Sequence, residues 1–377
     1  MSSASGRIAR IMFRELRIPL TVAFRHASAE RTETASAWVE ATGRDGLIGC
    51  GESCPRPYVT GETLDSASQF VTRHEGSVRR AVTSVDSLLA WMAVHRAEID
   101  ANPAAWCAIE LAVLDLLGKQ AGRPVETLLS RSPLAGRFCY TAVVGDASPA
   151  AFHAVAEKYL RLGFTDFKVK LSGDAERDAA KMEVFRRQRG PSLRIRADAN
   201  NLWANTHDAV DGLRRLDYPF FAIEEPIGRD RHADLPDIAR ALDCCLILDE
   251  SFVRRDQLSL LGEPLSQWIV NIRVSKMGGL IRSLEVAEAA RQHGVDVIVG
   301  AQVGETSLLT RAALPVARAA GERLVAQEGA FGTHLLQRDV CEPPIMFGAG
   351  GMLDASAHPA MAAPGLGTFS VPVDPAA

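Results

Sequence analysis

Basic and acidic residues recur roughly every 25 positions through the middle of the chain, a spacing typical of one barrel unit. Lys168 and Lys170 come first, and Asp198, Glu224 and Asp249 follow, each at the end of a short apolar segment. A strand, a loop, a helix and a return loop fill about 25 residues in a (β/α)₈ barrel, whose active site lies at the C-terminal ends of its strands. The spacing therefore predicts one site built from successive strand ends.

The three acids form a set of candidate metal ligands that offers only oxygen. Carboxylates of Asp198, Glu224 and Asp249 on neighbouring strands suit a hard divalent cation, and they favour Mg²⁺, which Mn²⁺ could replace, over zinc. Helix caps or loop salt bridges would explain any one of these acids, but not their near-equal spacing. We expect the adjacent acids Glu225 and Glu250 to point away from the barrel axis.

The two lysines offer a candidate for proton transfer. Residues two apart on a strand share a face, so Lys168 and Lys170 point one way while Phe167 and Val169 point the other. The helix layer of a barrel is apolar, which predicts that the lysines face the interior. Two cations confined together lower each other's pKa, so one of them would be a base near neutrality. The alternative is a solvated strand end that carries two surface lysines.

Composition gives few restrictions on function. The chain has 377 residues, 47% of them hydrophobic and 23% charged, with a formal net charge of -4. This charge gives no reason to expect nucleic acid or an anionic membrane as a partner. The sequence contains no apolar run of the length of a transmembrane helix, and no signal peptide is expected at its start. The odd number of cysteines, 7, fits reduced residues and predicts a cytoplasmic protein.

The periodicity of the sequence changes twice along the chain. Residues 8–55 alternate apolar and polar positions as in an antiparallel meander, and residues 62–118 have a helical pattern, so residues 1–130 are expected to form an α+β domain. We expect a barrel domain over residues 131–330. The segment 331–377 is rich in Pro and Gly and is expected to return to the first domain.

Within the barrel domain, strands are expected to alternate with helices, which favours a closed barrel over an open doubly wound sheet. The helices expected between these strands include Pro149–Leu162, Asp174–Arg187, Asn205–Leu216, Leu280–His293 and Thr306–Ala320. The eight expected strands are Cys139–Val144, Asp166–Val169, Leu193–Ala197, Phe220–Ile223, Cys245–Leu248, Trp268–Val274, Val295–Gly300 and Leu324–Gln327.

Nearly the whole chain resembles the enolase superfamily, and within its mandelate racemase/muconate lactonizing enzyme family the group of muconate lactonizing enzymes and dipeptide epimerases. The first domain carries the resemblance in Gly51-Glu52-Ser53, Val59-Thr60-Gly61-Glu62 and the segment from Ala108 to Asp115. The barrel carries it in Lys168-Val169-Lys170, Asp198-Ala199-Asn200, Glu224-Glu225-Pro226, Asp249-Glu250-Ser251 and Ser275-Lys276-Met277-Gly278-Gly279-Leu280.

The resemblance implies a (β/α)₈-type TIM barrel with an N-terminal α+β capping domain. It also implies Mg²⁺ on Asp198, Glu224 and Asp249, holding the carboxylate of a small-molecule substrate. A strand-two lysine, Lys170 by the motif match, would handle the α-proton, and the metal would stabilise the enediolate. Substrate-binding candidates lie in the capping loops, beside the metal ligands and after the seventh strand: Arg25, His26, Arg56, Tyr58, Asn200, Glu305 and Thr306.

One position departs from the group, which usually carries a catalytic lysine on the sixth strand. The segment reads Asn271-Ile272-Arg273-Val274-Ser275-Lys276, so Arg273 takes that place. Strand alternation would put Lys276 on the opposite face from Arg273, and Lys276 therefore does not look like a shifted replacement. Arginine keeps its proton to above about pH 12, so it is a poor base but a good carboxylate clamp. The alternative is that lysine was replaced by arginine at this position without any change in the function of the enzyme.

Chemistry on one face of the enediolate needs no second base, so the sequence favours a lyase or cycloisomerase that performs dehydration or lactonisation. One alternative is a racemase or epimerase of an amino-acid derivative or dipeptide, with Arg273 as the second acid or base. Another is a barrel that binds a ligand without catalysis, which would require loss of the metal ligands or of both lysines. We expect a homo-oligomer whose partner is a small carboxylate, with no nucleic acid or membrane partner.

Overall fold

The computed structural model describes residues 8–26, 29–188 and 193–371, and the side chains of residues 23–30 lie outside the described part. The N-terminal region begins with antiparallel strands, as the alternating pattern predicts. Three of them form a sheet in the order β1-β4-β5, and β2 pairs with β3 in a separate ribbon. Their bounds are β1 (Ile8–Leu16), β2 (Pro19–His26), β3 (Ala29–Glu33), β4 (Ser36–Gly43) and β5 (Ile48–Ser53).

Helix α4 (Pro103–Ala121) packs directly against this sheet. A Cβ atom added at Gly51 of β5 would lie 2.0 Å from the carbonyl oxygen of Ala108 and one at Gly49 would lie 2.1 Å from that of Ala112, so glycine permits the close approach. The helix is buried over most of its length, which fits its mostly apolar sequence. The other helices here are α1 (Leu64–Ala81), α2 (Val85–Val94), α3 (Arg96–Ala101) and α5 (Val125–Leu128).

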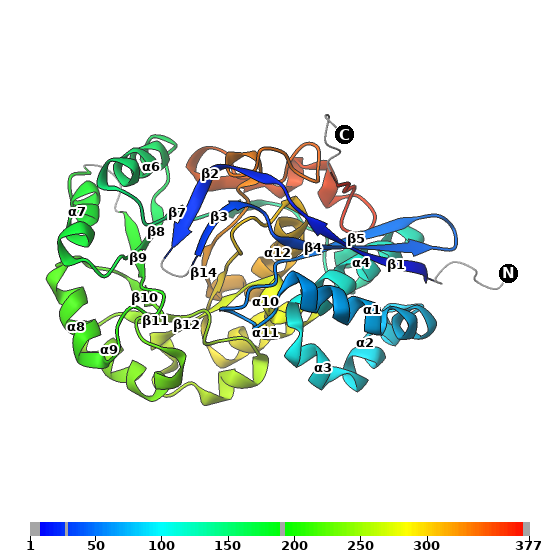
Figure 1. The fold of residues 1–377 in the computed structure, drawn as a ribbon, viewed down its shortest axis with the longest axis horizontal. Helices are drawn as coiled ribbons and strands as arrows, with labels where there is room; N and C mark the ends of the chain where they lie inside the picture. The colour runs from blue at the N-terminus through cyan, green and yellow to red at the C-terminus, as the bar shows by residue number, and fades with distance from the viewer. Residues whose placement is uncertain (1–7, 27–28, 189–192, 372–377) are drawn as a thin grey trace.

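Eight parallel strands form the second region in the consecutive order β7 to β14, which confirms the predicted barrel architecture (Figure 1). The sheet curls so that its two edges meet, since the backbone N–H of Thr141, next to β7, donates to the carbonyl oxygen of Gln327 in β14 at 2.7 Å. The strands are β7 (Ala142–Val144), β8 (Asp166–Lys170), β9 (Arg194–Asp198), β10 (Ala222–Glu224), β11 (Cys245–Leu248), β12 (Trp268–Ile272), β13 (Asp296–Val299) and β14 (Leu324–Gln327).

Helices connect the barrel strands, and none in the described part of the chain has both the length and the apolar character needed to cross a membrane. They are α6 (Pro149–Arg161), α7 (Ala175–Arg186), α8 (Thr206–Arg215), α9 (Leu235–Leu242), α10 (Val274–Met277), α11 (Leu280–His293) and α12 (Ser307–Ala320). Short 3-10 segments are η1 (Arg229–Asp234), η2 (Arg255–Leu260), η3 (Leu265–Gln267), η4 (Gly321–Arg323), η5 (Gly332–His334), η6 (Ala349–Gly351), η7 (Ala355–Ala357) and η8 (Pro359–Met361).

The first and sixth predicted strands differ from the structure because the chain leaves the barrel at one end of each, and the other strands differ by at most two residues at an end. The first expected strand is split into β6 (Arg137–Cys139) and β7, since β6 leaves the barrel and pairs with β15 (Met352–Asp354). The sixth strand ends at Ile272 rather than Val274, because the chain turns there into α10. Gly278 and Gly279 allow this turn with φ angles of 85° and 104°, which residues with a side chain adopt only at a cost.

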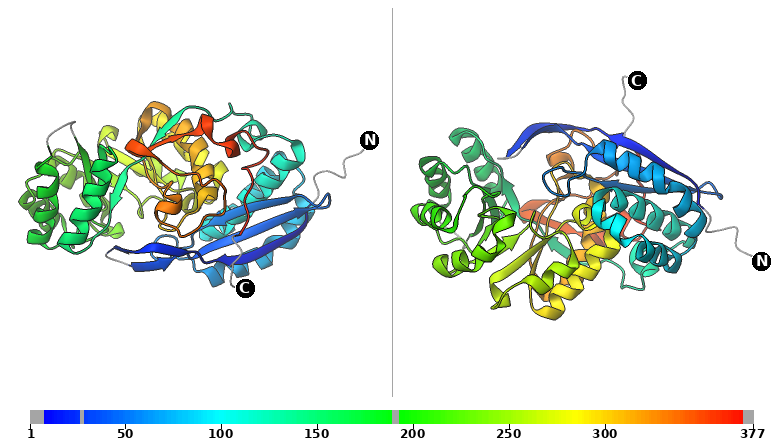
Figure 2. Two further views of the ribbon diagram at one scale, coloured as in Figure 1. Left: turned by 90° about the horizontal axis from the view of Figure 1, so that it is seen from above. Right: turned by 60° about the horizontal axis from the view of Figure 1, so that its bottom comes forward.

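The C-terminal segment contacts the N-terminal region, as the two further views show (Figure 2). The backbone N–H of Gly365 donates to Arg123 and its carbonyl accepts from Val125, and the N–H of Leu366 donates to the buried carboxylate of Asp115 at 2.7 Å. These bonds give a buried acid in α4 one of its hydrogen-bond donors and hold the C-terminal segment beside the first helices.

Candidate active site

The register of the barrel strands brings the predicted ladder of residues together. Lys170 lies opposite Asp198 in the ladder of β8 and β9, and Asp198 lies opposite Glu224 in that of β9 and β10. Asp249 follows β11 by one residue. All three acids and both lysines are buried at the same end of the sheet. The structure therefore assembles these five residues into one charged cluster.

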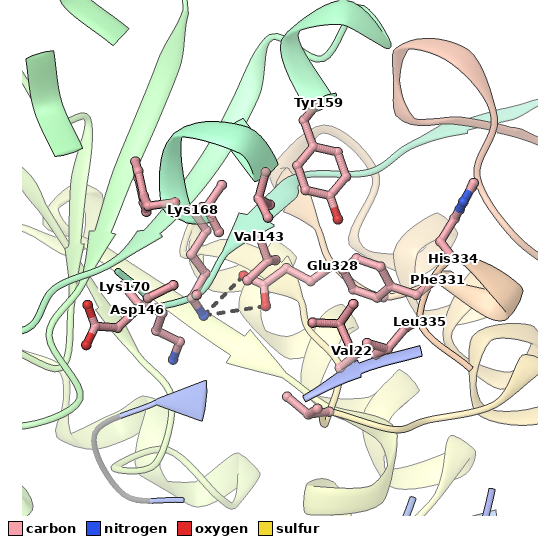
Figure 3. A pocket seen from close by; sticks show the side chains of 18 of the residues that line it. Val22, Val143, Asp146, Tyr159, Lys168, Lys170, Glu328, Phe331, His334 and Leu335 are labelled. Atoms are coloured by element: carbon pink, nitrogen blue, oxygen red, sulfur yellow. Dashed lines mark hydrogen bonds and ion pairs between the residues drawn. The ribbon is translucent and has the colours of Figure 1, made fainter. Parts of the chain in front are cut away.

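Lys168 is the innermost cation of this cluster, with 1% of its surface exposed. Its Nζ atom lies 2.9 Å from Asp198 and 2.8 Å from Glu224. It also lies 3.3 Å from Glu328, a contact drawn in Figure 3. Burial alone would lower the pKa of Lys168, but these three carboxylates together raise it. The expectation that confinement of two cations lowers the lysine pKa is therefore wrong for Lys168, because the nearby acids outweigh the second cation.

Lys170 differs from Lys168 in its access to solvent, since 8% of its surface is exposed and its side chain lines the cavity described below. Its Nζ atom lies 2.5 Å from Asp198 and donates to the side-chain oxygen of Asn200 at 2.7 Å. Asn200 reaches this place from a left-handed backbone conformation with φ of 44°. Of the two lysines, Lys170 is thus the one with fewer ion pairs and a side chain nearer the mouth of the site.

Asp249 is held by two cations that follow the next strand, β12. The guanidinium of Arg273 donates to it in a short contact, and Lys276 Nζ lies 2.9 Å from its Oδ1 atom. Burial would raise the pKa of Asp249, but Arg273 and Lys276 hold it well below its usual range. Burial by itself lowers the pKa of Arg273, while Asp249 and other acids raise it above that of a free guanidinium. Arg273 therefore remains a cation, and it also donates to Gln302 at 2.9 Å.

Lys276 requires a correction to the argument from strand alternation. Because α10 begins after Arg273, Lys276 turns back toward Asp249 and also donates to the carbonyl oxygens of Asp249 and Asn271 at 2.7 and 2.8 Å. It is fully buried and does not line the cavity. Lys276 thus contacts a candidate metal ligand, but it has no direct access to a substrate in the cavity.

The donor set fits a divalent cation in its chemistry. The three acids have no measurable exposure, and Glu224 Oε2 is a buried oxygen without a hydrogen-bond partner. Burial raises the pKa of Glu224 well above its usual range, and the neighbouring Asp198 raises it further. A cation with two charges between these carboxylates would relieve this cost. Asp198, Glu224 and Asp249 are therefore the residues that would hold Mg²⁺ here.

The ligand atoms of the three acids lie farther apart than those of a bound metal would. Within the described residues, the group of three that places one ligand atom each within 4.8 Å of the others is His74, His95 and Glu98, not the strand-end acids. Lys168 and Lys170 hold Asp198, while Arg273 and Lys276 hold Asp249 on the other side. Binding of a metal would require these cations to give up part of their contacts.

A cavity of about 580 Å³ opens above the charged cluster. Lys168, Lys170, Asn200, Glu250 and Arg273 line its floor. Its wall is largely apolar and combines the capping strand β2 with the barrel loops and the segment after β14 (Figure 3). The apolar residues of this wall include Val22, Val143, Phe152, Tyr159, Phe331 and Leu335.

Of the seven substrate-binding candidates, Tyr58 and Asn200 line this cavity. The side chains of Arg25 and His26 lie outside the described residues. Arg56 is buried beside the cavity and donates to the carbonyl oxygens of Ala35, Pro55 and Val303 at 2.8–2.9 Å. Its guanidinium therefore fixes loops, and its side chain does not line the cavity.

Glu305 and Thr306 also lie away from the cavity wall. Glu305 accepts from the backbone N–H of Gln302 at 2.7 Å, and burial raises the pKa of its carboxyl to about 7. Thr306 caps α12 and donates to the buried Glu52 at 2.5 Å. These contacts hold the loop after β13 against β5 of the capping sheet.

Sequence reasoning missed Glu328 and predicted the wrong direction for Glu250. Glu328 follows β14 and pairs with both Lys168 and Arg196, whose Nη2 atom lies 2.6 Å away. Its place at a strand end was the available signal, since the other acids of the site also follow strands. Glu250 was expected to point away from the axis, but it lines the cavity and accepts from Asn200 at 3.3 Å. Its neighbour Glu225 instead accepts from the backbone of Asp249 and Ser251 at 2.7 and 2.8 Å.

Comparison with known proteins agrees with this geometry. Residues 151–369 match the family described as "Enolase C-terminal domain-like". The chain belongs to the enolase superfamily. It is 30% identical over 345 residues to the L-Lys-D/L-Arg epimerase of Methylococcus capsulatus, with 89% of this chain and 93% of that protein covered.

Solved structures give the same fold. The dipeptide epimerase of Methylococcus capsulatus, complexed with Mg and the dipeptide L-Arg-D-Lys, is 27% identical and superposes with a TM-score of 0.77 over 97% of this chain and 100% of that one. The muconate lactonizing enzyme of Pseudomonas fluorescens is 23% identical with a TM-score of 0.82 over 98% of this chain and 97% of that one, a similarity of fold. The relatives favour epimerisation over the lyase or cycloisomerase chemistry that the sequence favours.

Proposed function

We propose that this enzyme removes and returns the α-proton of a carboxylate substrate, and that it thereby racemises or epimerises an amino-acid derivative or dipeptide. The observation that carries the proposal is Lys170, a lysine that lines the cavity beside three buried carboxylates. A base must come within hydrogen-bond reach of the proton that it removes, and a side chain on the cavity floor satisfies this condition. The proposal takes its reaction class from the epimerase relatives.

A divalent cation on Asp198, Glu224 and Asp249, Mg²⁺ or Mn²⁺ as its substitute, would supply the positive charge that stabilises an enediolate. The chain itself supplies the rest of the environment. Lys168, with its three acid partners, is suited to a fixed cation beside the substrate carboxylate rather than to proton transfer. Lys170 moves the α-proton, and Asn200 fixes its position through the 2.7 Å hydrogen bond.

The return of the proton on the opposite face would involve Arg273. Its guanidinium lies across the cavity floor and is oriented by Gln302 and Asp249. As a donor of a proton it has the right charge, but the acids around it raise its pKa further above neutrality. In the proposed epimerisation, Arg273 would therefore be the slow partner of Lys170.

The same property of Arg273 favours a second candidate function. In a one-face reaction, Lys170 removes the α-proton and then protonates a leaving group on the same side, as in dehydration, or it serves a lactonisation. Arg273 then only clamps a carboxylate, a role that suits a permanent cation. The two candidates differ in whether the product has inverted configuration.

The cavity wall indicates an apolar group on the substrate. Val22 of β2 is 71% exposed although it lines the cavity, so an apolar substrate group would cover it. The acid Asp146 on the wall is already paired, at 2.8 Å with both Arg177 and Lys181. Glu328 is likewise paired with Lys168 and Arg196. These pairs leave neither acid as a ready partner for a substrate ammonium group.

We also propose the division of the chain into a capping domain over residues 1–130, a catalytic barrel over 131–330 and a returning segment over 331–377. The placement of β2 over the cavity supports a capping role for the first region, since Thr21 and Val22 contribute to the cavity wall. A homo-oligomer remains a proposal that sedimentation analysis would test.

A screen for inverted product tests the proposal. N-acyl amino acids and dipeptides with apolar side chains are incubated with the enzyme and Mg²⁺, and the optical rotation is followed. Hydroxy acids, acid sugars and muconates are tested in parallel as substrates of the one-face reactions, dehydration and lactonisation. Inversion of an apolar amino-acid derivative, absent with Lys170→Ala, is expected. Elimination or ring closure without inversion would replace the proposal by the second candidate.

A further inference from the structure

A cluster of two histidines and one glutamate lies in the N-terminal helices, apart from the catalytic cavity. His74 belongs to α1, Glu98 belongs to α3, and His95 joins α2 to α3. Glu98 lies between the two rings, with its Oε2 atom 2.9 Å from His74 Nε2 and its Oε1 atom 2.9 Å from His95 Nδ1. One ligand atom of each residue lies within 4.8 Å of the other two.

His74 is buried among aromatic rings, and its contact with Glu98 is an ion-pair distance without hydrogen-bond geometry. Its ring is packed against Phe70 at 4.4 Å between centroids and lies edge-on to Trp91 at 5.6 Å, with 5% of the residue exposed. Its Nε2 atom points at the cluster but makes no hydrogen bond, although Glu98 is near. A buried imidazole nitrogen without a hydrogen bond carries a desolvation cost that a ligand would remove.

The cluster is also open to an ion from solvent. The side chains of His95 and Glu98 are 24% and 46% exposed, while the Trp91 ring stacks on His95 at 4.0 Å and limits its orientation. One side of the cluster is thus fixed by packing, and Glu98 on the other side can adjust. Tetrahedral ligands at 2.0–2.2 Å from a metal lie roughly 3.4 Å apart, so the 2.9 Å contacts would open by about 0.5 Å.

We propose that His74, His95 and Glu98 form a second metal site, which takes a transition-metal ion such as Zn²⁺ and leaves one position to water. Two imidazoles and one carboxylate are ligands of this ion class, whereas Mg²⁺ prefers oxygen donors. The site would therefore differ in metal preference from the three strand-end acids. By joining α1 to the junction of α2 and α3, the ion would stabilise the helices of the N-terminal region.

The test uses the full-length enzyme in saturating Mg²⁺, so that the strand-end acids do not compete for the added ion. Zn²⁺ is titrated calorimetrically, and Cu²⁺ or Ni²⁺ is followed by quenching of tryptophan fluorescence, because Trp91 contacts both histidine rings. Wild type is expected to bind one additional ion and to gain thermal stability with Zn²⁺.

His95→Ala and Glu98→Gln should each weaken Zn²⁺ binding by at least about tenfold and remove the gain in Tm, with the α-proton activity unchanged. His153→Ala is the matched control, since His153 and Glu157 form an exposed pair at 3.1 Å without a second histidine in it. Absence of Zn²⁺ binding to wild type, or equal binding by wild type and both site variants, would overturn the proposal and leave a hydrogen-bonded cluster.

Discussion

Replacement of Lys168 by Met tests whether the two lysines differ as their contacts indicate. Lys168 is the shared cation of Asp198, Glu224 and Glu328, and all three carboxylates are buried. Removal of one partner from a buried ion pair costs about 3–5 kcal/mol, because the remaining charge stays buried without compensation. In a domain of this size, that loss lowers Tm by about 6–20 °C.

Lys170→Met should cost less, about 1–2 kcal/mol, since Asp198 keeps Lys168 and the backbone N–H of Asn200 at 3.1 Å. Its effect on turnover should be the larger one, at about 10²–10⁴-fold for the loss of a general base. Urea denaturation in EDTA at pH 7 and steady-state kinetics with Mg²⁺ measure the two effects. The assignment would be refuted by a Lys168→Met variant as stable as wild type, or by a Lys170→Met variant less stable than Lys168→Met.

The pH dependence of this difference also follows from the contacts. The acids raise the pKa of Lys168 in the folded state, so its contribution to stability is complete below the unfolded value of about 10.4 and is lost as the pH rises through the folded value. The stability difference between wild type and Lys168→Met should therefore be constant from about pH 6 to pH 9 and become smaller only above about pH 10.4.

Three further variants test other parts of the site. Asp249→Asn should lower Mg²⁺ affinity by at least about tenfold in calorimetry while the circular dichroism spectrum stays folded, and unchanged affinity would exclude Asp249 as a ligand. Arg273→Lys should increase inversion of the substrate relative to its other reactions, because a buried lysine can titrate and arginine cannot; a decrease would argue that the guanidinium itself delivers the proton. Burial raises the pKa of Glu52 to about 8, so wild-type stability should fall as the pH rises from about 5 to 8. Glu52→Gln should make the dependence of stability on pH less steep by up to about 1.4 kcal/mol per pH unit. An unchanged slope would contradict a raised pKa for Glu52.

The barrel was predictable from the sequence because each apolar segment that ends in an acid is a strand. The bounds of β11, β14 and α11 agree with the prediction. Those of β8 differ by one residue at its C-terminal end, and those of β9 differ by one residue at each end. The positions of Lys170, Asp198 and Glu224 also follow from local spacing, since parallel strands in register bring such residues side by side. The superfamily followed from these same motifs.

The remaining features depend on contacts that local patterns do not contain. The pair of Lys168 and Glu328 joins β8 to the end of β14, and it forms only when the barrel closes. Alternation was wrong for Glu250 and Lys276 because both lie beyond the ends of their strands, where the backbone no longer alternates. The pKa of Lys168 depends on the balance of three acids against burial, which the spacing of two lysines cannot give.

Exchange of the substrate α-proton with solvent deuterium tests the central claim most directly. A substrate found in the screen is incubated in D₂O with wild type or Lys170→Ala, each with Mg²⁺ or with EDTA, and the α-proton signal is followed by NMR. Proton transfer by Lys170 predicts deuterium at the α-carbon with wild type and Mg²⁺, and no exchange without the metal or without Lys170. Exchange by Lys170→Ala at the wild-type rate, or equal exchange in EDTA, would contradict the account.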